Sequence, residues 1–236
     1  MSKRTILDIL FPRRCPVCGE IVKPAGGLIC PPCFQKLSFV TGPVCKKCGK
    51  EIADGTMEFC EDCMAHRHTF ESGVALLNYD EIARKSMVQM KYNNKREYLD
   101  FYGEAMAIRY ETVIRRMQVD VIVPVPVHRS RRRKRGFNQA ELLAEILGKK
   151  LNIPVENNCL RRDRRTLPQK ELSPTERLKN LTGAFRAETL PKHMRRILLV
   201  DDIYTTGSTL EACARALKRA GAENVYFAVI CMTGGR

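Results

Sequence analysis

Two adjacent carboxylates, Asp201 and Asp202, directly follow the apolar run 197–200. The residues after them, 203–209, are mostly small or hydroxyl-bearing and include Gly207. The apolar run predicts a buried strand that ends at the two acids. Carboxylates at the carboxyl end of a strand, beside a turn whose backbone N–H groups can bind an anion, suit a ligand with vicinal hydroxyls and a phosphate.

This run resembles the signature of type I phosphoribosyltransferases. In that family the paired acids hold the ribose hydroxyls of phosphoribosyl pyrophosphate, and the loop after them holds its 5′-phosphate. The resemblance therefore assigns Asp201 and Asp202 to the ribose. It assigns the 5′-phosphate to the five loop residues Thr205, Thr206, Gly207, Ser208 and Thr209.

A helix is predicted over 209–220, because an apolar i, i+3, i+4, i+7 stripe precedes basic residues at its end. Ser208 stands where many type I phosphoribosyltransferases have a second glycine. Ser208 and Glu211 also have the spacing of a capping box, so Ser208 is either a structural cap or a phosphate ligand. The simplest alternative is a strand, a turn and a helix without a ligand, but two consecutive acids suit a plain turn poorly.

Eight of the eleven cysteines lie in the first 63 residues, in four Cys-x-x-Cys pairs. The pairs are Cys15 and Cys18, Cys30 and Cys33, Cys45 and Cys48, and Cys60 and Cys63. The pattern of two pairs repeats after thirty residues, and glycine follows the second cysteine of each repeat. Four thiolates supply a closed tetrahedral site, so two structural zinc ions are predicted, one in each repeat.

Two alternatives to tandem zinc ribbons remain at this point. A cross-braced arrangement would join the first pair to the third. A disulfide framework would need an oxidising compartment and would leave three cysteines unpaired, so zinc is favoured. These three, Cys159, Cys213 and Cys231, are interpreted as small buried hydrophobic residues. His66 and His68 are interpreted as linker residues rather than ligands, because the cysteines already complete both sites.

The chain of 236 residues is strongly basic, with 41 Lys and Arg against 26 Asp and Glu and a formal charge of +15. Zinc bound by eight thiolates would lower this charge to roughly +11, which still favours a polyanionic partner. The apolar runs are too short to span a bilayer, and residues 1–12 lack the pattern of a secretory signal. We therefore expect no membrane insertion, a cytoplasmic protein, and a short docking helix at the N-terminus.

From about residue 71 the pattern changes to alternating strands and helices. Strands are predicted over 73–79, 119–127, 197–203 and 224–231, and helices over 80–92, 97–117, 138–151 and 209–220. This alternation indicates an α/β domain with a mainly parallel sheet. The predicted division is therefore a double zinc-ribbon domain over 1–70 and a phosphoribosyltransferase-like domain over 71–236.

A basic stretch follows the strand predicted at 119–127: six of the seven residues 129–135 are Lys or Arg. Such a run is either a solvated loop or an anion site, and its place after a buried strand favours the anion site. Arg129 is the candidate for pyrophosphate, with 135–139 closing the loop. The polar segment 161–185 is interpreted as a lid over the site, with surface disorder as the alternative.

Taken together, these features resemble the ComF family of competence proteins, which pair a double zinc ribbon with a phosphoribosyltransferase-like domain. The residues that carry the resemblance are the doubled cysteine pairs, Met90-Lys91-Tyr92, Pro124–Gln139, Arg165-Thr166-x-x-Gln169, Glu176-Arg177-x-x-Asn180 and Val200–Thr209. Membership implies a cytoplasmic role in handling incoming single-stranded DNA during natural transformation.

Three functions are compatible with these motifs. The first is an adaptor that binds single-stranded DNA and keeps a phosphoribosyl pyrophosphate site. The second is an active transferase that uses Mg²⁺, with Asp201, Asp202 and Arg129 in catalytic roles and an unknown acceptor. The third is a structural bridge whose ribbons dock a competence helicase. We favour the first.

Overall fold

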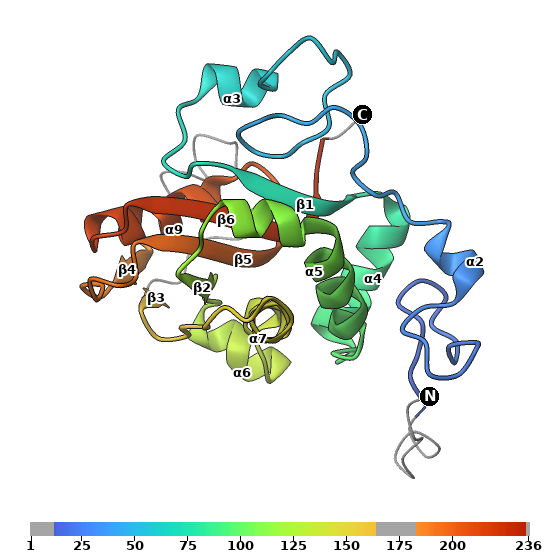
Figure 1. Ribbon diagram of the computed structural model, residues 1–236. Helices are drawn as coiled ribbons and strands as arrows, with labels where there is room; N and C mark the ends of the chain where they lie inside the picture. The colour runs from blue at the N-terminus through green and yellow to red at the C-terminus, as the bar shows by residue number, and fades with distance from the viewer. Residues whose placement is uncertain (1–11, 164–182, 235–236) are drawn as a thin grey trace.

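The computed structural model describes residues 12–163 and 183–234, and a parallel sheet forms the centre of this part of the chain (Figure 1). The sheet has four strands in the order β1-β6-β5-β2, and its neighbouring strands run parallel. The strands are β1 (Gly73–Asn78), β2 (Val121–Pro124), β5 (Arg196–Tyr204) and β6 (Asn224–Met232). The predicted α/β fold with a mainly parallel sheet is confirmed.

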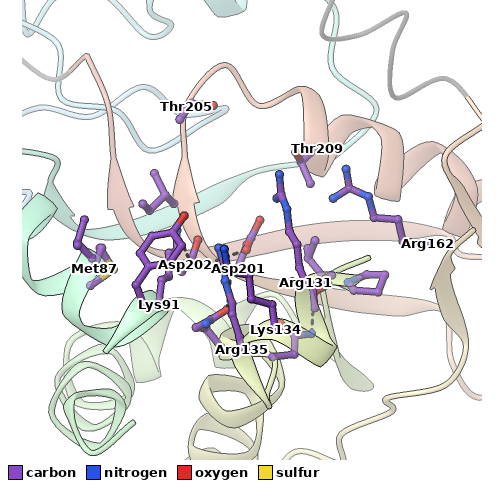
Figure 2. Close-up of a pocket in the computed structure, with 18 of the residues that line it drawn as sticks. Met87, Lys91, Arg131, Lys134, Arg135, Arg162, Asp201, Asp202, Thr205 and Thr209 are labelled. Atoms are coloured by element: carbon purple, nitrogen blue, oxygen red, sulfur yellow. Dashed lines mark hydrogen bonds and ion pairs between the residues drawn. The ribbon is translucent and has the colours of Figure 1, made fainter. Parts of the chain in front are cut away.

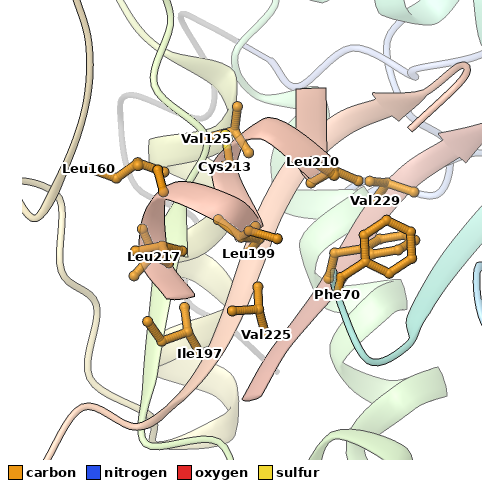
Figure 3. Close-up of a cluster of buried hydrophobic side chains, with 14 of the residues drawn as sticks. Phe70, Val125, Leu160, Ile197, Leu199, Leu210, Cys213, Leu217, Val225 and Val229 are labelled. Atoms are coloured by element: carbon orange, nitrogen blue, oxygen red, sulfur yellow. The ribbon is translucent and has the colours of Figure 1, made fainter. Parts of the chain in front are cut away.

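Alternate residues of β5 face two separate hydrophobic clusters, as the period of two along a strand requires. Leu198 and Val200 pack in the cluster that includes α4 (Glu81–Tyr92), α5 (Tyr98–Arg116) and α7 (Gln139–Leu151). Ile197 and Leu199 face the other side of the sheet, where α9 (Ser208–Arg219) covers them (Figure 3). The antiparallel pair β3 (Leu160–Arg162) and β4 (Phe185–Ala187) extends that second layer.

The two cysteine-rich modules pack against different parts of this core (Figure 1). The first, which contains α2 (Pro31–Phe34), contacts α5: Arg13 lies 2.6 Å from Asp100, and the Phe34 ring meets Phe101 edge-on. The second contains α3 (Glu61–Ala65), and its Cys45, Cys48 and Cys60 belong to the same buried cluster as the sheet residue Phe227.

The segment between the two modules covers the open edge of β1. The Val40 N–H donates to the Leu76 carbonyl over 3.1 Å, and the Asn78 N–H donates to the Ser38 carbonyl over 2.8 Å. Arg109 on α5 also donates to the Val40 carbonyl. An edge strand with unpaired backbone groups can pair with other chains, so these bonds both protect the edge and fix the modules to the sheet.

The basic stretch 129–135 forms the helix α6 (Arg129–Arg135) and not a loop. The His128 ring accepts a hydrogen bond from the Ser130 N–H at its start, and Gly136 ends it with φ +78°. The strand before it is shorter than predicted: β2 ends at Pro124, and Pro124 and Pro126 have no N–H for a ladder. The docking helix expected near the N-terminus falls outside the described residues.

Within the described ranges, none of the helices has both the length and the apolar character needed to cross a membrane.

Candidate functional site

A cavity of about 680 Å³ opens where β2 and β5 end and where α4 and α6 approach them. Small-molecule sites usually have 300–1,000 Å³, and parallel sheets place them at this edge. Figure 2 shows Asp201 and Asp202 in the middle of the cavity, Met87 and Lys91 on one side, and Arg131 and Arg162 on the other. The two acids, predicted from sequence, therefore lie together at the cavity.

The two acids have different surroundings although they are neighbours in the chain. Lys91 Nζ on α4 lies 2.8 Å from Asp202 Oδ2, with both side chains largely buried. The backbone N–H of Asp202 donates to Asp201 Oδ1 over 2.8 Å. Burial and the nearby charge of Asp202 raise the pKa of Asp201 to about 7. One acid is thus neutralised by a lysine, and the other holds its proton unusually well.

Cations outnumber acids around the cavity. Among the described residues that line it are two carboxylates and five cationic side chains, which are Lys91, Arg131, Lys134, Arg135 and Arg162. Burial and the positive charge of Arg131 lower the pKa of Arg162. Cations that face one another across a cavity favour an anion between them. The cavity therefore suits a ligand with several negative charges.

Helical periodicity decides which residues of α6 reach the cavity. Arg131, Lys134 and Arg135 have i, i+3, i+4 spacing, which places them on one face of the helix. Arg129, the residue predicted to bind pyrophosphate, begins α6, is exposed, and is not among the residues that line the cavity. Arg133 is also exposed and faces away from the cavity.

The segment after α6 builds one wall of the cavity. Phe137 is buried, with the Arg96 guanidinium 4.3 Å from its ring centroid. Asn138 Oδ1 accepts from the Ala140 N–H and begins α7, while Asn138 Nδ2 donates to the Val125 carbonyl. Gln139 Oε1 accepts from Arg135, but its buried Nε2 has no partner among the described residues. That amide is a donor available to a ligand oxygen.

The predicted phosphate loop lies at the same edge of the sheet. Thr205 and Thr209 line the cavity, whereas Thr206, Gly207 and Ser208 are not among its lining residues. Gly207, with φ +72°, is the residue before α9. The expected capping box does not form, because Gly207 occupies the N-cap position and the Glu211 carboxylate accepts hydrogen bonds from Thr69. Ser208 is therefore not the helix cap, and its hydroxyl lies 2.9 Å from that of Thr206.

An apolar side of the cavity is formed by residues of α4 and β5 and of the turn between β1 and α4, namely Tyr79, Met87, Val88, Tyr92 and Ile203. Tyr92 is 63% exposed, and the Arg135 guanidinium lies 5.2 Å from its ring centroid. The role of Lys91 was not predicted, although it occurs in one of the motifs quoted above. Its spacing of four residues from Met87 is the signal that places both on one helical face. Most of the lid expected over 161–185 lies outside the described residues, but Arg162 lines the cavity.

The eight N-terminal cysteines form two separate clusters, Cys15, Cys18, Cys30 and Cys33, and Cys45, Cys48, Cys60 and Cys63. Within each cluster the sulfur atoms lie within 4.8 Å of one another, and Cys48 and Cys60 are 3.6 Å apart. Zn–S bonds of about 2.3 Å give a tetrahedron with edges of about 3.8 Å, so both clusters fit zinc. The tandem pairing is confirmed, and the cross-braced and disulfide alternatives are wrong.

The remaining cysteines and histidines lie apart from the metal clusters. Cys159, Cys213 and Cys231 are buried, as predicted. His66 and His68 belong to neither cysteine cluster. His68 is more than a linker residue, however, because its ring stacks on Phe70 at 4.6 Å and lies 3.7 Å from Glu211.

Two protein families match successive parts of the chain. A double zinc ribbon domain matches residues 6–64, and a phosphoribosyl transferase domain matches residues 96–236. The second match contains Asp201, Asp202 and the whole of α6, whereas Lys91 and Tyr92 lie before it.

Several curated relatives are also similar to this chain. Competence protein F of Haemophilus influenzae is 40% identical over 108 residues, 45% of this chain and 47% of that protein. DNA utilization protein YhgH of Escherichia coli is 41% identical over 114 residues, 48% of this chain and 50% of that protein. Competence protein ComFC of Bacillus subtilis is 29% identical over 147 residues, 62% of this chain and 58% of that protein.

The chain thus spans about half the length of the curated relatives it matches. Their names agree with the resemblance to competence proteins, and the two family matches confirm the predicted order of a zinc ribbon followed by a transferase domain. The chain belongs to the phosphoribosyl transferase domain family and carries a double zinc ribbon domain ahead of that domain.

Proposed function

We propose that this protein handles single-stranded DNA during transformation and binds phosphoribosyl pyrophosphate with Mg²⁺ in the cavity at the end of β5. The observation that carries the proposal is a cavity that holds the adjacent acids Asp201 and Asp202 together with five cations from the described part of the chain. In this proposal the protein works in the cytoplasm, with a competence helicase as a partner. Relatives named for competence and DNA utilization support the DNA role.

The three parts of phosphoribosyl pyrophosphate match three parts of the cavity. Asp201 and Asp202 would accept hydrogen bonds from the ribose hydroxyls. The segment 205–209, which leads into the first turn of α9, would hold the 5′-phosphate through its backbone N–H groups and hydroxyls. The face of α6 with Arg131, Lys134 and Arg135 would hold the pyrophosphate, a role that sequence alone gave to Arg129.

The residues present also fit Mg²⁺, which prefers hard oxygen ligands and keeps several waters. Pyrophosphate and ribose oxygens would supply most ligands, with Asp201 and Asp202 close by. The metal would neutralise charge on the pyrophosphate. Lys91 would hold the Asp202 side chain in place through the ion pair that it already forms.

Single-stranded DNA would follow the outer face of α6. Arg129 and Arg133 are exposed there and point away from the small-molecule cavity, so they are free to contact a phosphate backbone. Of the aromatic residues Tyr92, Phe137 and Tyr204, the last two are buried and Tyr92 is exposed, so Tyr92 is the one that could stack on a base. Tyr92 lines the cavity beside Arg135, the last residue of α6, so a strand on the outer face would turn around that end of the helix to reach the ring. Basic groups next to an exposed ring are typical of single-strand sites.

Isothermal titration calorimetry with phosphoribosyl pyrophosphate and Mg²⁺ tests the ligand. The wild-type chain should bind, and the Asp201→Asn/Asp202→Asn double variant should lose binding while its affinity for an oligo-dT strand is retained. Absence of heat from the folded, zinc-loaded wild type would remove phosphoribosyl pyrophosphate from the proposal. Loss of oligo-dT binding in the double variant would show that one site serves both ligands.

The alternative is an active transferase that attaches the phosphoribosyl group to an acceptor. The apolar side of the cavity favours it, because Tyr79, Met87 and Val88 would suit a planar acceptor beside Asp202. In that reaction a bond from the acceptor to the anomeric carbon forms as the bond to pyrophosphate breaks. Release of pyrophosphate in the presence of an acceptor, abolished in the double variant, would establish the enzyme.

A further inference from the structure

The second zinc ribbon lies directly against the support of the predicted phosphate loop. Lys47, in this ribbon, lies 5.8 Å from the centroid of the Phe70 ring. Phe70 meets Phe227 edge-on at 4.9 Å, and Phe227 stacks on Tyr204 at 5.4 Å. Phe70, Phe227 and Tyr204 are each at most 3% exposed and share one cluster with three of the ribbon's cysteines. A continuous row of rings thus connects the ribbon to the end of β5.

Tyr204 is the last ring of this row and supports Gly207. A Cβ atom added at Gly207 would lie 2.4 Å from the Tyr204 hydroxyl oxygen and 2.6 Å from the ring carbon that carries it. The loop therefore rests on the ring so closely that only glycine fits, and its φ of +72° requires glycine as well. The position of the Tyr204 ring sets the position of the loop.

A second connection runs through the segment that follows the ribbon. The backbone N–H and the hydroxyl of Thr69 donate to the Glu211 carboxylate over 2.7 and 2.6 Å. The backbone N–H of Glu211 donates in turn to the Gly207 carbonyl over 2.8 Å. Glu211 is 3% exposed, so water does not replace these bonds readily. Glu211 thus links Gly207, at the end of the loop, to Thr69 in the segment that follows the second ribbon.

The first ribbon offers a natural contrast. Its contacts with the rest of the described chain include those of Arg13 and Phe34 with α5, on the opposite side of the sheet from α9. The glycines that follow the second cysteine of each ribbon, Gly19 and Gly49, here called the knuckle glycines, also differ in their contacts with the rest of the chain. A Cβ at Gly49 would lie 2.5 Å from the Gly73 carbonyl oxygen, at the start of β1, whereas a Cβ at Gly19 would have nothing within 4 Å.

We infer that Tyr204 is a positioning residue for the phosphate loop and that the second zinc ribbon, but not the first, holds it in place through Phe70 and Phe227. This inference rests on the proposed function, because it assumes that the loop 205–209 binds a 5′-phosphate. It assigns regulation of the site: loss or displacement of the second ribbon lowers affinity for the 5′-phosphate end of the ligand, and the pyrophosphate end is unaffected.

The test compares the Gly49→Ala and Gly19→Ala variants of the 236-residue chain, each verified to contain two zinc ions. Binding of ribose 5-phosphate and of inorganic pyrophosphate, each with Mg²⁺, is measured by calorimetry. Gly49→Ala should weaken the affinity for ribose 5-phosphate about tenfold, as the loss of one charged hydrogen bond does. Its affinity for pyrophosphate should stay within about twofold of the wild type. Gly19→Ala should change neither. Equal loss for both ligands in Gly49→Ala, or equal effects in both variants, would overturn the inference.

Further variants keep the test decisive if Gly49→Ala does not fold. Phe70→Leu and Tyr204→Leu interrupt the row of rings, leave every cysteine in place, and should weaken ribose 5-phosphate alone. Tyr204→Phe keeps the ring and should bind within about threefold of the wild type. If both leucine variants bind ribose 5-phosphate as the wild type does, this inference is overturned but the role proposed for the loop is not. If the wild type does not bind ribose 5-phosphate, the role proposed for the loop is overturned as well.

Discussion

Lys91 Nζ, on α4, lies 2.8 Å from Asp202 Oδ2, at the end of β5. The side chains are 18% and 13% exposed, so water screens the pair only in part. Burial alone would lower the pKa of Lys91, but the charges of Asp202 and Asp201 raise it above its ordinary value. The lysine therefore stays charged and joins α4 to the two acids.

Replacement of Asp202 by Asn should destabilise the protein. The substitution leaves the Lys91 ammonium in a largely buried place without its ionic partner, at a cost of about 1–3 kcal/mol. Urea unfolding at pH 7.5 in the presence of zinc measures this cost. Removing both partners, as Lys91→Met/Asp202→Asn, should recover part of the loss. A double variant no more stable than Asp202→Asn would show that the pair does not carry the effect.

Replacement of Asp201 by Asn should have the opposite sign at neutral pH. The folded chain binds the Asp201 proton more tightly, with a pKa of about 7, than the unfolded chain, where the ordinary value is 3.8. The wild-type chain therefore loses stability as the pH rises from about 4 to about 7, because Asp201 ionises more readily in the unfolded state than in the folded state. Asn does not ionise, so its advantage should grow over that window and reach at least about 1 kcal/mol at pH 8.

Denaturant unfolding of Asp201→Asn and wild type at pH 5.5, 6.5 and 8 checks this trend. An advantage of Asn that is constant with pH would mean that Asp201 does not titrate in this window. A destabilised Asp201→Asn at every pH would mean that its hydrogen bond from the Asp202 N–H outweighs the cost of its charge.

The two knuckle glycines should respond differently to alanine. Gly19 and Gly49 both have φ near +75°, so alanine strains each by about 1–2 kcal/mol. Only at Gly49 does the added Cβ also collide with backbone, at the start of β1. Gly49→Ala should therefore cost about 1–3 kcal/mol more than Gly19→Ala. Thermal unfolding with both zinc ions bound compares them, and equal costs would show that the second ribbon does not pack on β1 in solution.

Local patterns in the sequence predicted most of the strands, helices and zinc ligands. The acids after an apolar run, and cysteines at fixed spacing, are local signals that need no knowledge of distant contacts. Lys91 was not assigned to the site, because its partner Asp202 lies more than a hundred residues away and only the fold brings α4 to the end of β5. The roles of Arg131 and Lys134 depended on 129–135 being a helix, and a run of cations gives no hydrophobic period from which to predict one.

The two faces of α6 should separate the two proposed ligands. Arg131→Gln removes a cation from the cavity and should weaken the affinity for phosphoribosyl pyrophosphate about tenfold or more. Arg133→Gln removes an exposed cation of the same helix and should leave that affinity unchanged. For oligo-dT, Arg133→Gln should lower the slope of log K against log salt by about 0.7, the value for one lost phosphate contact on a single strand. Unchanged slopes in Arg133→Gln would exclude the outer face of α6 as the DNA path.

Tyr92 should contribute to single-strand binding through its ring and not through charge. It is 63% exposed beside Arg135, whereas Phe137 and Tyr204 are buried. Tyr92→Ala should weaken oligo-dT binding by about 1–3 kcal/mol, and Tyr92→Phe should bind as the wild type, because stacking needs only the ring. The salt slope should not change in either variant, since no phosphate contact is lost. Fluorescence anisotropy over a salt series measures both quantities, with Ile108→Ala, 74% exposed on α5, as a control. Equal affinities for Tyr92→Ala and the control would show that the bases do not stack on this residue, and a reduced slope would mean that Tyr92 acts by orienting Arg135.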